Sequence, residues 1–545
     1  MFRRSWRHAA AATAALLALT SITACSDDPA ESQDLSENRA GAMDGYAVGT
    51  QFKATEPVSF PILYNNHPNY PLKNDWLFWS ELKSRTNVTL EPVAVPLSDY
   101  EQKRSLLIGA GDAPLLLPKT YPSQEEPYVS SGAILPVSDY LNLMPNLSDK
   151  IEKWNLGPEI DTRRQDDGKF YLLPGLHEKA WHDYSLAVRT DILEELNLEV
   201  PKTWDDLYLV LKAMKAAYPD VYPFSDRFSQ PNPGGNLLNI LAFSYGLQGA
   251  GWNFQHTSWN AQAQKFEYTG ATEQYKQMLQ YLNKLVSEKL LDPESFTQTD
   301  DKARQKLANS QSFVISANAQ AVVNDYRPDL SRNPDAKIAK IPLPIGPAGE
   351  INPADRLENG LMISSKARDS KNFVAMMQFV DWLFYSDEGQ EFAKWGVEGQ
   401  TFVRDAAGKP TLAPDVDIIG LNPGAPKHLQ KDFGFYNGVF AYGGKPELVQ
   451  AFFSEEEQQF QEVMNARAPR VVPPPHPFTD EEREQVSLWA TPLRDHVYQA
   501  TLQFILGQRD FAQWDAYLAE LKSKNMDSYM ETVTKAYERF RDKNN

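Results

Sequence analysis

Only one residue of this chain carries a thiol, and its position indicates a chemistry for it. Cys25 is the sole cysteine among 545 residues. It follows Arg3, Arg4 and Arg7 and an apolar stretch over residues 9–19, which is far shorter than the roughly 20 residues that span a bilayer. This layout is typical of a secretory signal peptide. Because a thiolate is a good nucleophile, Cys25 is a candidate for covalent modification at the end of the leader.

Residues 22–25 (ITAC) resemble the bacterial lipobox, in which small residues precede a cysteine that is lipidated and becomes the first residue after cleavage. The resemblance implies that residues 1–24 are a lipoprotein signal peptide and that Cys25 carries acyl chains such as palmitate. Each buried methylene contributes about 0.8 kcal/mol, so two or three chains would anchor the protein at the extracellular face of the cell membrane. The alternative is an ordinary signal peptide with an incidental cysteine.

A search for catalytic patterns is mostly negative. The chain has no P-loop, no Gly-x-Gly-x-x-Gly after a strand, no His-Glu-x-x-His and no Gly-x-Ser-x-Gly. His177 and His182 lie five residues apart, without a carboxylate frame that would indicate zinc. The 72 acidic residues could supply a glycosidase pair of carboxylates, but nothing selects one pair. We predict no catalytic residue, no metal and no cofactor, and keep a surface-anchored glycan hydrolase or lyase as an alternative.

Composition and charge limit the class of partner. The signal peptide holds three of the 54 basic residues and none of the 72 acidic ones, which leaves a net charge of −21 on the mature chain. Nucleic-acid binding relies on clustered lysine and arginine, so no nucleic-acid partner is expected. Residues 25–56 are poor in aliphatic residues and predict a flexible tether. The length of the remainder, with 42% apolar residues overall, predicts two or three globular domains.

Strand-like and helix-like patterns alternate along the sequence, and the strands and helices that they predict must position any site. Short apolar runs typical of strands in an α/β sheet occur at residues 58–64, 170–173, 185–188 and 313–315. A helix is predicted to start at Thr203, with Asp206 as a capping-box partner, and another at Thr479, with Glu482. Apolar residues at helical spacing follow position 207 and recur at residues 278–286, 373–384 and 511–521.

Several phrases, taken in order, are similar to those of the extracellular solute-binding proteins of bacterial ABC importers, the family that includes maltose- and oligosaccharide-binding proteins. They are residues 168–174 (GKFYLLP), 186–193 (LAVRTDIL), 198–207 (LEVPKTWDDL), 381–390 (DWLFYSDEGQ) and 395–402 (WGVEGQTF). The last part, with residues 504–507 (FILG) and 514–518 (WDAYL), resembles the long lipoprotein subgroup.

The chain departs from the family pattern in two places. The family often has Gly-Asp-x-Pro-Asp-Ile at the end of its first helix, whereas residues 111–115 are GDAPL, so one binding-site carboxylate is missing or replaced. Subgroup members often carry an Asp/Asn-rich calcium loop after the helix that here starts at Thr203. Residues 218–223 (YPDVYP) lack such alternating oxygen ligands, and we predict no calcium there.

The resemblance implies an α/β fold like that of periplasmic binding proteins, with two α/β lobes, a hinge that the chain crosses more than once, and the ligand in the cleft between the lobes. We place lobe one at residues 55–173 plus 344–386 and lobe two at residues 174–343 plus 387–545. The implied function is that of a monomeric, lipid-anchored receptor, not an enzyme, which captures a carbohydrate, in particular an oligosaccharide, and delivers it to an ABC permease. A binding protein for a non-sugar ligand such as a peptide is a further alternative.

A sugar presents apolar C–H faces and a ring of hydroxyl groups, so its site needs aromatic platforms and polar side chains. The aromatic candidates, chosen for their loop-like contexts, are Tyr121, Trp181, Tyr184, Trp252, Trp395, Tyr436 and Phe440. The polar candidates are Asp112, Arg163, Arg189 and Asn318. For each aromatic residue the alternative is burial in the core. Arg189 could instead pair with a structural carboxylate, and Asn318 could cap a turn.

Overall fold

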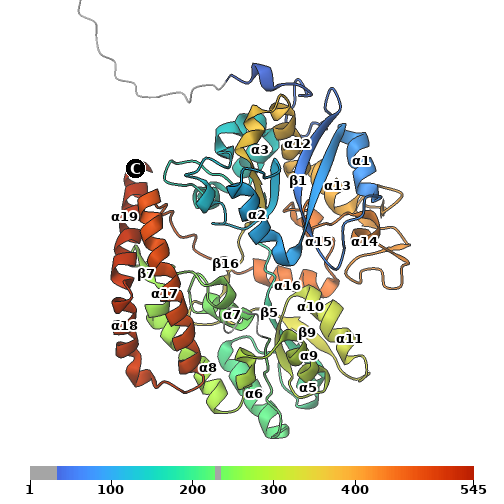
Figure 1. Cartoon of the computed structure of the whole chain (residues 1–545). Coiled ribbons are helices and arrows are strands. Elements are labelled where there is room, and N and C mark those ends of the chain that lie inside the picture. Colours follow the sequence, from blue (N-terminus) through green and yellow to red (C-terminus); the bar gives the residue numbers. More distant parts are fainter. Residues whose placement is uncertain (1–33, 228–234, 545) are drawn as a thin grey trace, which may run out of the picture.

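The fold is built around two hydrophobic cores, each of which contains a β-sheet. The structure, a computed structural model, describes residues 34–227 and 235–544, so the predicted signal peptide and Cys25 lie outside the described residues. By core membership we define lobe one as residues 34–176 and 357–452, and lobe two as residues 185–343 and 460–544. Figure 1 shows lobe one above lobe two, with α16 (Glu455–Asn465) and β16 (Ala468–Pro469) between them.

Lobe one holds a five-stranded sheet in the order β2-β1-β3-β11-β4. Its strands are β1 (Val58–Asn66), β2 (Val88–Pro96), β3 (Leu116–Thr120), β4 (Leu173–Leu176) and β11 (Leu357–Ile363). β1 is parallel to β2 and β3, whereas β11 is antiparallel to β3 and β4. The run predicted as a strand at residues 58–64 is β1, and the buried run at 170–173 reaches the sheet only with its last residue. The helices of this part of the chain are α1 (Leu77–Thr86), α2 (Tyr100–Gly109), α3 (Pro145–Lys153) and α4 (Gly157–Asp161).

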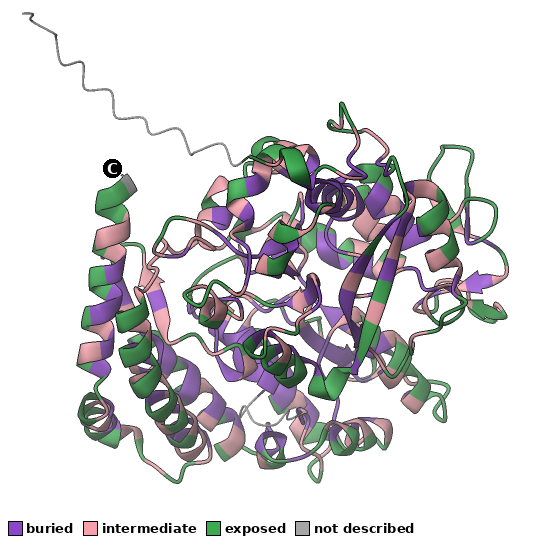
Figure 2. Ribbon diagram, turned by 45° about the horizontal axis from the view of Figure 1, so that its top comes forward, coloured by how far each residue is buried: buried purple, intermediate pink, exposed green. Residues whose placement is uncertain are grey.

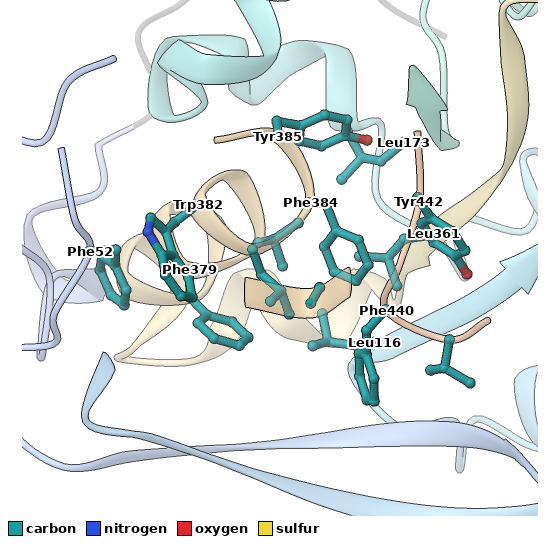
Figure 3. Packing of buried hydrophobic residues seen from close by; sticks show 14 of the residues in the cluster. Phe52, Leu116, Leu173, Leu361, Phe379, Trp382, Phe384, Tyr385, Phe440 and Tyr442 are labelled. Atoms are coloured by element: carbon teal, nitrogen blue, oxygen red, sulfur yellow. The ribbon is translucent and has the colours of Figure 1, made fainter. Parts of the chain in front are cut away.

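The centre of lobe one is α12 (Phe373–Tyr385), a helix whose residues are all buried. Its sequence, FVAMMQFVDWLFY, is apolar almost all round, as expected for a helix enclosed by a core. Figure 3 shows Phe379 and Trp382 of this helix in the same cluster as Leu116 and Leu361 of the sheet. The helix predicted at residues 373–384 is confirmed.

The N-terminal segment is ordered onto lobe one from residue 34, contrary to the tether predicted over residues 25–56. Phe52 is fully buried and packs near Phe379, with ring centroids 6.3 Å apart. The Tyr46 hydroxyl donates to Asp381 Oδ2 at 2.9 Å, and the Gln378 side chain bonds the backbone of residue 43 at 2.9 and 3.0 Å. The prediction is wrong for residues 34–56 because it counted aliphatic residues and overlooked the aromatic ones, which pack on α12.

Residues 387–452 also pack in lobe one, whereas the sequence-based division assigned them to lobe two. Only Ser386 separates α12 from α13 (Asp387–Trp395), whose Phe392 packs on Trp382 with ring centroids 6.1 Å apart. A helix that follows α12 so closely stays in the same core. The later elements of this region are α14 (Leu429–Phe433), α15 (Pro446–Gln450), β12 (Phe402–Arg404), β13 (Pro410–Leu412), β14 (Val416–Asp417) and β15 (Lys427–His428).

Lobe two contains a three-stranded antiparallel sheet in the order β8-β5-β9. Its strands are β5 (Ser185–Arg189), β8 (Val314–Ala317) and β9 (Ile338–Ile341), and the first two match predicted runs. α6 (Trp204–Ala217) starts with the predicted capping box, in which Thr203 and Asp206 bond each other at 2.9 and 3.0 Å. The other elements are α5 (Thr190–Glu195), α7 (Gly235–Ser244), α8 (Glu273–Ser287), α9 (Asp300–Ala308), α10 (Ala319–Ala321), α11 (Arg327–Leu330), β6 (Thr257–Asn260) and β7 (Lys265–Tyr268).

The C-terminal helices α17 (Asp480–Ile505), α18 (Trp514–Ser523) and α19 (Met526–Asn544) pack on lobe two, against α8 and β7. α17 starts at the predicted cap, where Thr479 and Glu482 bond each other at 3.2 and 2.9 Å. In Figure 2 the helix that ends at the C-terminus is banded in buried and exposed colours, as expected for a helix with one face in the core. In Figure 1, α17 and α19 rise along the left side to the level of lobe one.

The chain passes between the two cores three times within the described residues, over 177–184, 344–356 and 453–459. The second connection meets the chain beyond the third where β10 (Ile351–Asn352) pairs in parallel with β16. This is the predicted hinge that is crossed more than once, and it leaves each lobe as a separately packed body.

Candidate functional site

A cavity of about 650 Å³ lies between the two lobes, beside the hinge. Its walls come from the loops after β3 and α4 in lobe one, from residues 248–257 and the start of α17 in lobe two, and from residues 470–478, the connecting segment between β16 and α17. Cavities of this size are typical of small-molecule sites. The polar side chains of the lining include Ser123, Glu126, Arg163, Gln165, Gln248, Asn253, His256, Asp355, Arg470 and Arg483.

Tyr121 lines this cavity from lobe one and is 48% exposed. It directly follows β3, and its backbone N–H donates to Gln124 Oε1 at 3.1 Å, which fixes the turn after the strand. A large exposed ring at the end of a sheet strand, in the wall of a cavity, offers a platform on which a ligand can stack.

Tyr184 and Trp252 form an aromatic pair at the lobe-two side. Their ring centroids are 5.2 Å apart and the rings meet edge to face at 72°. Trp252 lies in a 3-10 turn that starts at Gly251, whose φ is +59° and where a Cβ would come within 2.2 Å of the backbone of α7. Both rings are half-buried, and Gln248 and Asn253, close to Trp252 in sequence, line the cavity. The structure therefore brings two of the predicted residues together.

Asn318 has the capping role that was considered as its alternative, and its role in ligand binding stays a prediction. Its Oδ1 accepts a hydrogen bond from the backbone of Ala321 at 2.8 Å and caps α10. Its Nδ2 lies 3.5 Å from Asp183 Oδ2, next to the aromatic pair. Burial, together with Asp183, raises the pKa of Tyr184 to about 12, so the Tyr184 hydroxyl is protonated near neutral pH and can donate a hydrogen bond.

Tyr436 lies at the boundary between the lobes in an uncommon backbone conformation. Its φ is +52°, in the left-handed region that few non-glycine residues adopt, and its ring packs on Phe452 at 4.2 Å. Burial raises the pKa of Tyr436, and Glu358 of lobe one and Asp183 beside lobe two raise it further. Carboxylates from both sides of the boundary therefore act on this hydroxyl. Strained residues gather at functional sites, which supports Tyr436 as a candidate.

Trp181 lies at the hinge, in the first connection between the lobes. Its ring is 6.0 Å from that of His177 and 5.8 Å from that of Phe453. His177 Nε2 in turn bonds Glu358 Oε2 of β11 at 2.9 Å. Among the described residues the buried Trp181 indole N–H has no hydrogen-bond partner. The structure thus places Trp181 where the connections pack together, outside the wall of the cavity.

The structure places two of the predicted aromatic residues in the core of lobe one, away from the cavity. Trp395 is buried in the core of lobe one and stacks on Phe452, with ring centroids 4.2 Å apart. Phe440 is buried in the same core and stacks on Phe78 at 4.6 Å. Both have glycine-rich, loop-like sequence nearby, but Trp395 is the last residue of α13 and Phe440 packs on α1, so both rings point into the core, as the core alternative stated.

Two of the polar candidates lie outside the wall of the cavity. Arg189 is buried, and its guanidinium bonds the Asp191 carboxylate at 2.5 and 2.7 Å, so its role is the structural ion pair considered as the alternative. Asp112 is exposed and precedes β3, at the opposite end of this strand from Tyr121. The remaining polar candidate, Arg163, lines the cavity.

Sequence reasoning missed most of the polar lining. Gln248 and Asn253 lie in one loop, far from Arg483 in the chain, and they line the same cavity only because this loop and the start of α17 both face lobe one. One signal was present in the sequence, namely the proline run 473–475 before the capped helix. Such a run has a fixed extended path, and it forms part of the cavity wall.

The cavity contains neutral imidazoles near pH 7. Burial lowers the pKa of His256 and that of His476 to about 4. Each ring can therefore donate one hydrogen bond and accept another. The charges of the lining come from arginine and carboxylate side chains.

Across residues 34–227 and 235–544, no group of three or more His, Cys, Asp or Glu side chains is arranged to hold a metal ion. In these same ranges no helix is both long enough and apolar enough to cross a bilayer.

Two α/β lobes joined by three connections, with a cavity between them walled by rings and hydrogen-bonding groups, define a two-lobed receptor that binds a solute in its cleft. The chain belongs to the family of bacterial extracellular solute-binding proteins, whose sequence model matches residues 76–391. This match confirms the predicted family. It also favours a binding protein over the alternative of a glycan hydrolase or lyase.

Individual relatives extend the likeness over most of the chain. The fructooligosaccharide ABC transporter substrate-binding protein FusA of Streptococcus pneumoniae serotype 4 (strain ATCC BAA-334 / TIGR4) is 23% identical over 536 residues, 93% of this chain and 95% of FusA. The structure of FusA in complex with kestose has a TM-score of 0.62 at 20% identity and covers 89% of this chain and 100% of that one. The crystal structure of the alginate-binding protein AlgQ2 without calcium ion has a TM-score of 0.66 at 19% identity, with 90% and 99% covered. These likenesses confirm the predicted fold class.

Proposed function

We propose that this protein captures an oligosaccharide for an ABC importer. The observation that carries the proposal is the exposed Tyr121 ring of lobe one in the wall of the cavity, opposite a lobe-two wall that contains Gln248 and Asn253. Asn253 directly follows Trp252, which pairs with Tyr184. A sugar between the two walls could stack its C–H faces on rings while its hydroxyl groups meet the amides and neutral imidazoles of the lining. The printed names of the relatives, which refer to fructooligosaccharide and alginate, support a saccharide over a peptide.

In this proposal, ligand binding draws the lobes together. A saccharide in contact with Tyr121 of lobe one and Asn253 of lobe two interacts with both only when the cleft is closed. A ligand shifts a conformational equilibrium by the difference in its affinity for the two states. A dissociation constant in the micromolar range, about −8 kcal/mol, is sufficient for capture and still allows release to a permease.

We further propose that Cys25 carries a lipid anchor at the extracellular face of the cell membrane. Residues 26–33 separate Cys25 from Asp34, whose carbonyl accepts from Arg368 of lobe one at 3.1 Å. Even a fully extended chain spans at most about 3.5 Å per residue, so the receptor would stay within about 30 Å of the membrane, near its permease. The Cys25→Ser variant should leave the membrane fraction and retain ligand binding. Full retention of this variant in the membrane fraction would refute the anchor.

The saccharide proposal is tested by a thermal-shift screen of the mature chain, residues 26–545, against mono- and oligosaccharides of two to five units and against short peptides. A cleft ligand stabilises the folded state by mass action, so we expect a concentration-dependent rise in Tm with one class of oligosaccharide and none with peptides. A rise in Tm with peptides alone would contradict the proposal that the ligand is a saccharide. Hydrolysis or elimination products in the incubated sugars would support the alternative function of a glycan hydrolase or lyase.

A further inference from the structure

We propose that the cavity contains a subsite for the carboxylate of a uronic acid unit, formed by Arg163 of lobe one and Arg470 of the connecting segment. This inference rests on the proposed function, because it concerns one unit of the oligosaccharide. It makes the ligand an acidic oligosaccharide.

The charge of the cavity lining differs from that of the whole molecule. The chain has a net charge of −18, yet the lining contains four arginines, no lysine and three carboxylates. One of these carboxylates, Glu159, already accepts from Arg356, which lies outside the lining, at 2.7 Å. The wall of the cavity is therefore a positive region within an acidic protein, and such a region attracts an anionic ligand.

The other two arginines of the lining have their hydrogen bonds largely satisfied. Arg164 donates to Asp161 Oδ1 and to the carbonyl of Gly168, both at 2.8 Å. Arg483 donates to the carbonyl of Glu126 at 3.3 Å, to Gln165 Oε1 at 3.1 Å and to the carbonyl of Phe478 at 3.1 Å. These side chains brace the wall, and few of their donors remain for a ligand.

Arg163 and Arg470, by contrast, converge on a single carboxylate oxygen. Asp355 Oδ2 lies 2.8 Å from Arg470 Nη2 and 3.5 Å from Arg163 Nη2. Its second oxygen, Oδ1, accepts from the backbone of Leu357 at 3.1 Å. Two guanidinium groups thus face one carboxylate, which leaves one positive charge in excess at this point.

Arg163 has the most unused hydrogen-bonding capacity. Its side chain is only 14% exposed, and apart from the ion pair with Asp355 at 3.5 Å its guanidinium makes no hydrogen bond to another described residue, with Nε buried. The nearby Glu125 does not fully compensate this charge, because burial raises its pKa to about 7 and a large fraction is protonated near neutral pH. A buried guanidinium without acceptors is costly, so an acceptor that arrives with the ligand would be bound strongly.

A carboxylate matches this need better than sugar hydroxyl groups do. Its two oxygens accept parallel N–H bonds from a guanidinium fork, and its charge offsets the excess at Asp355. Tyr121 in the wall of the same cavity could stack on the ring that carries the carboxylate. Recognition of a neutral sugar would leave the second guanidinium uncompensated.

The test is titration calorimetry of the mature chain with oligogalacturonides of two to four units and with neutral hexose oligosaccharides of equal length, each at low and high salt. We expect oligogalacturonides to bind at least tenfold tighter than the neutral sugars, with affinity that falls as salt rises. Arg163→Gln should lower oligogalacturonide affinity at least tenfold and neutral-sugar affinity little. Arg163→Lys keeps the positive charge but lacks the guanidinium fork, so its oligogalacturonide affinity should lie between those of the parent and of Arg163→Gln. Arg404→Gln, on the exposed β12 strand, is the matched control and should bind like the parent.

The Asp355→Asn variant distinguishes an effect on the subsite from an effect on folding. It should strengthen oligogalacturonide binding because it removes the competing carboxylate, whereas a damaged fold would not raise the affinity. Neutral oligosaccharides that bind as tightly as oligogalacturonides, or an Arg163→Gln variant that weakens both classes equally, would overturn the subsite and leave the proposed function intact. Failure of every saccharide to bind would overturn both.

Discussion

Arg539 of α19 and Asp166 of lobe one are joined by a hydrogen-bonded ion pair in which Nε lies 2.9 Å from Oδ1. The same guanidinium donates to Glu482, the capping-box residue of α17, at 2.7 and 2.8 Å. α17 and α19 are packed in the core of lobe two. The pair therefore connects the C-terminal helices across the cleft to the loop that precedes β4, next to the cavity residue Gln165.

This contact between the lobes predicts a role in ligand affinity. Asp166→Asn should weaken saccharide binding up to about fivefold, because the pair forms between the lobes and a half-exposed ion pair contributes at most about 1 kcal/mol. The loss should be largest at low salt. Calorimetric titration at two salt concentrations measures it. The control is Lys535→Gln, whose partner Glu531 lies on the same helix, and equal affinities for parent and Asp166→Asn at low salt would contradict the role.

Two tryptophans from the predicted set should behave in opposite ways. Trp395→Ala removes a fully packed core ring and should lower the free energy of unfolding by about 3 to 5 kcal/mol. Trp252→Ala removes a half-buried ring beside the cavity residue Asn253 and should cost far less stability. Urea denaturation of both variants distinguishes them. A Trp252→Ala variant as unstable as Trp395→Ala would mean that Trp252 is a core residue.

The buried carboxyl of Glu125 predicts a dependence of stability on pH. Its folded-state pKa of about 7 lies above the ordinary 4.5, so the folded protein favours the protonated form. The stabilisation is fully present below pH 4.5 and is lost as pH rises through 7, by about 3 kcal/mol at most. Glu125→Gln, which is neutral at every pH, should become more stable relative to the parent from pH 5 to pH 8.

Urea denaturation at pH 5 and pH 8 checks this prediction, with the exposed Glu273→Gln as the control. The comparison with the parent matters because buried His256 and His476 act in the other direction and destabilise the fold as pH falls. The same stability difference between Glu125→Gln and the parent at both pH values would show that Glu125 ionises normally.

The ordered N-terminal segment predicts that residues 34–56 are part of the fold. Phe52→Ala should lower the free energy of unfolding by about 3 to 5 kcal/mol, because the ring is fully buried against α12. Val48→Ala, at an exposed position of the same segment, should have little effect. Thermal denaturation compares the two. Equal Tm values for Phe52→Ala and Val48→Ala would contradict this prediction and indicate that the segment is a tether.

The sequence specified local structure well and long-range geometry poorly. The capping boxes at Thr203 and Thr479 and the apolar helix α12 were predictable because their signals lie within a few residues of one another. The lobe assignment of residues 387–452 was not, since it depends on which core a helix packs against. For the site, Tyr121, Tyr184 and Trp252 share a loop-like context with Trp395 and Phe440, and only the folded chain separates rings at the cleft from rings in the core.

The central claim is that an oligosaccharide binds between the lobes in contact with rings from both. Titration calorimetry of the mature chain and of its Tyr121→Ala and Trp252→Ala variants with oligosaccharides of two to five units tests it most directly. The account predicts one-to-one binding of one saccharide class at micromolar Kd, and at least a tenfold loss of affinity in each variant, one from each lobe. Absence of saccharide binding, or binding that neither variant weakens, would contradict it.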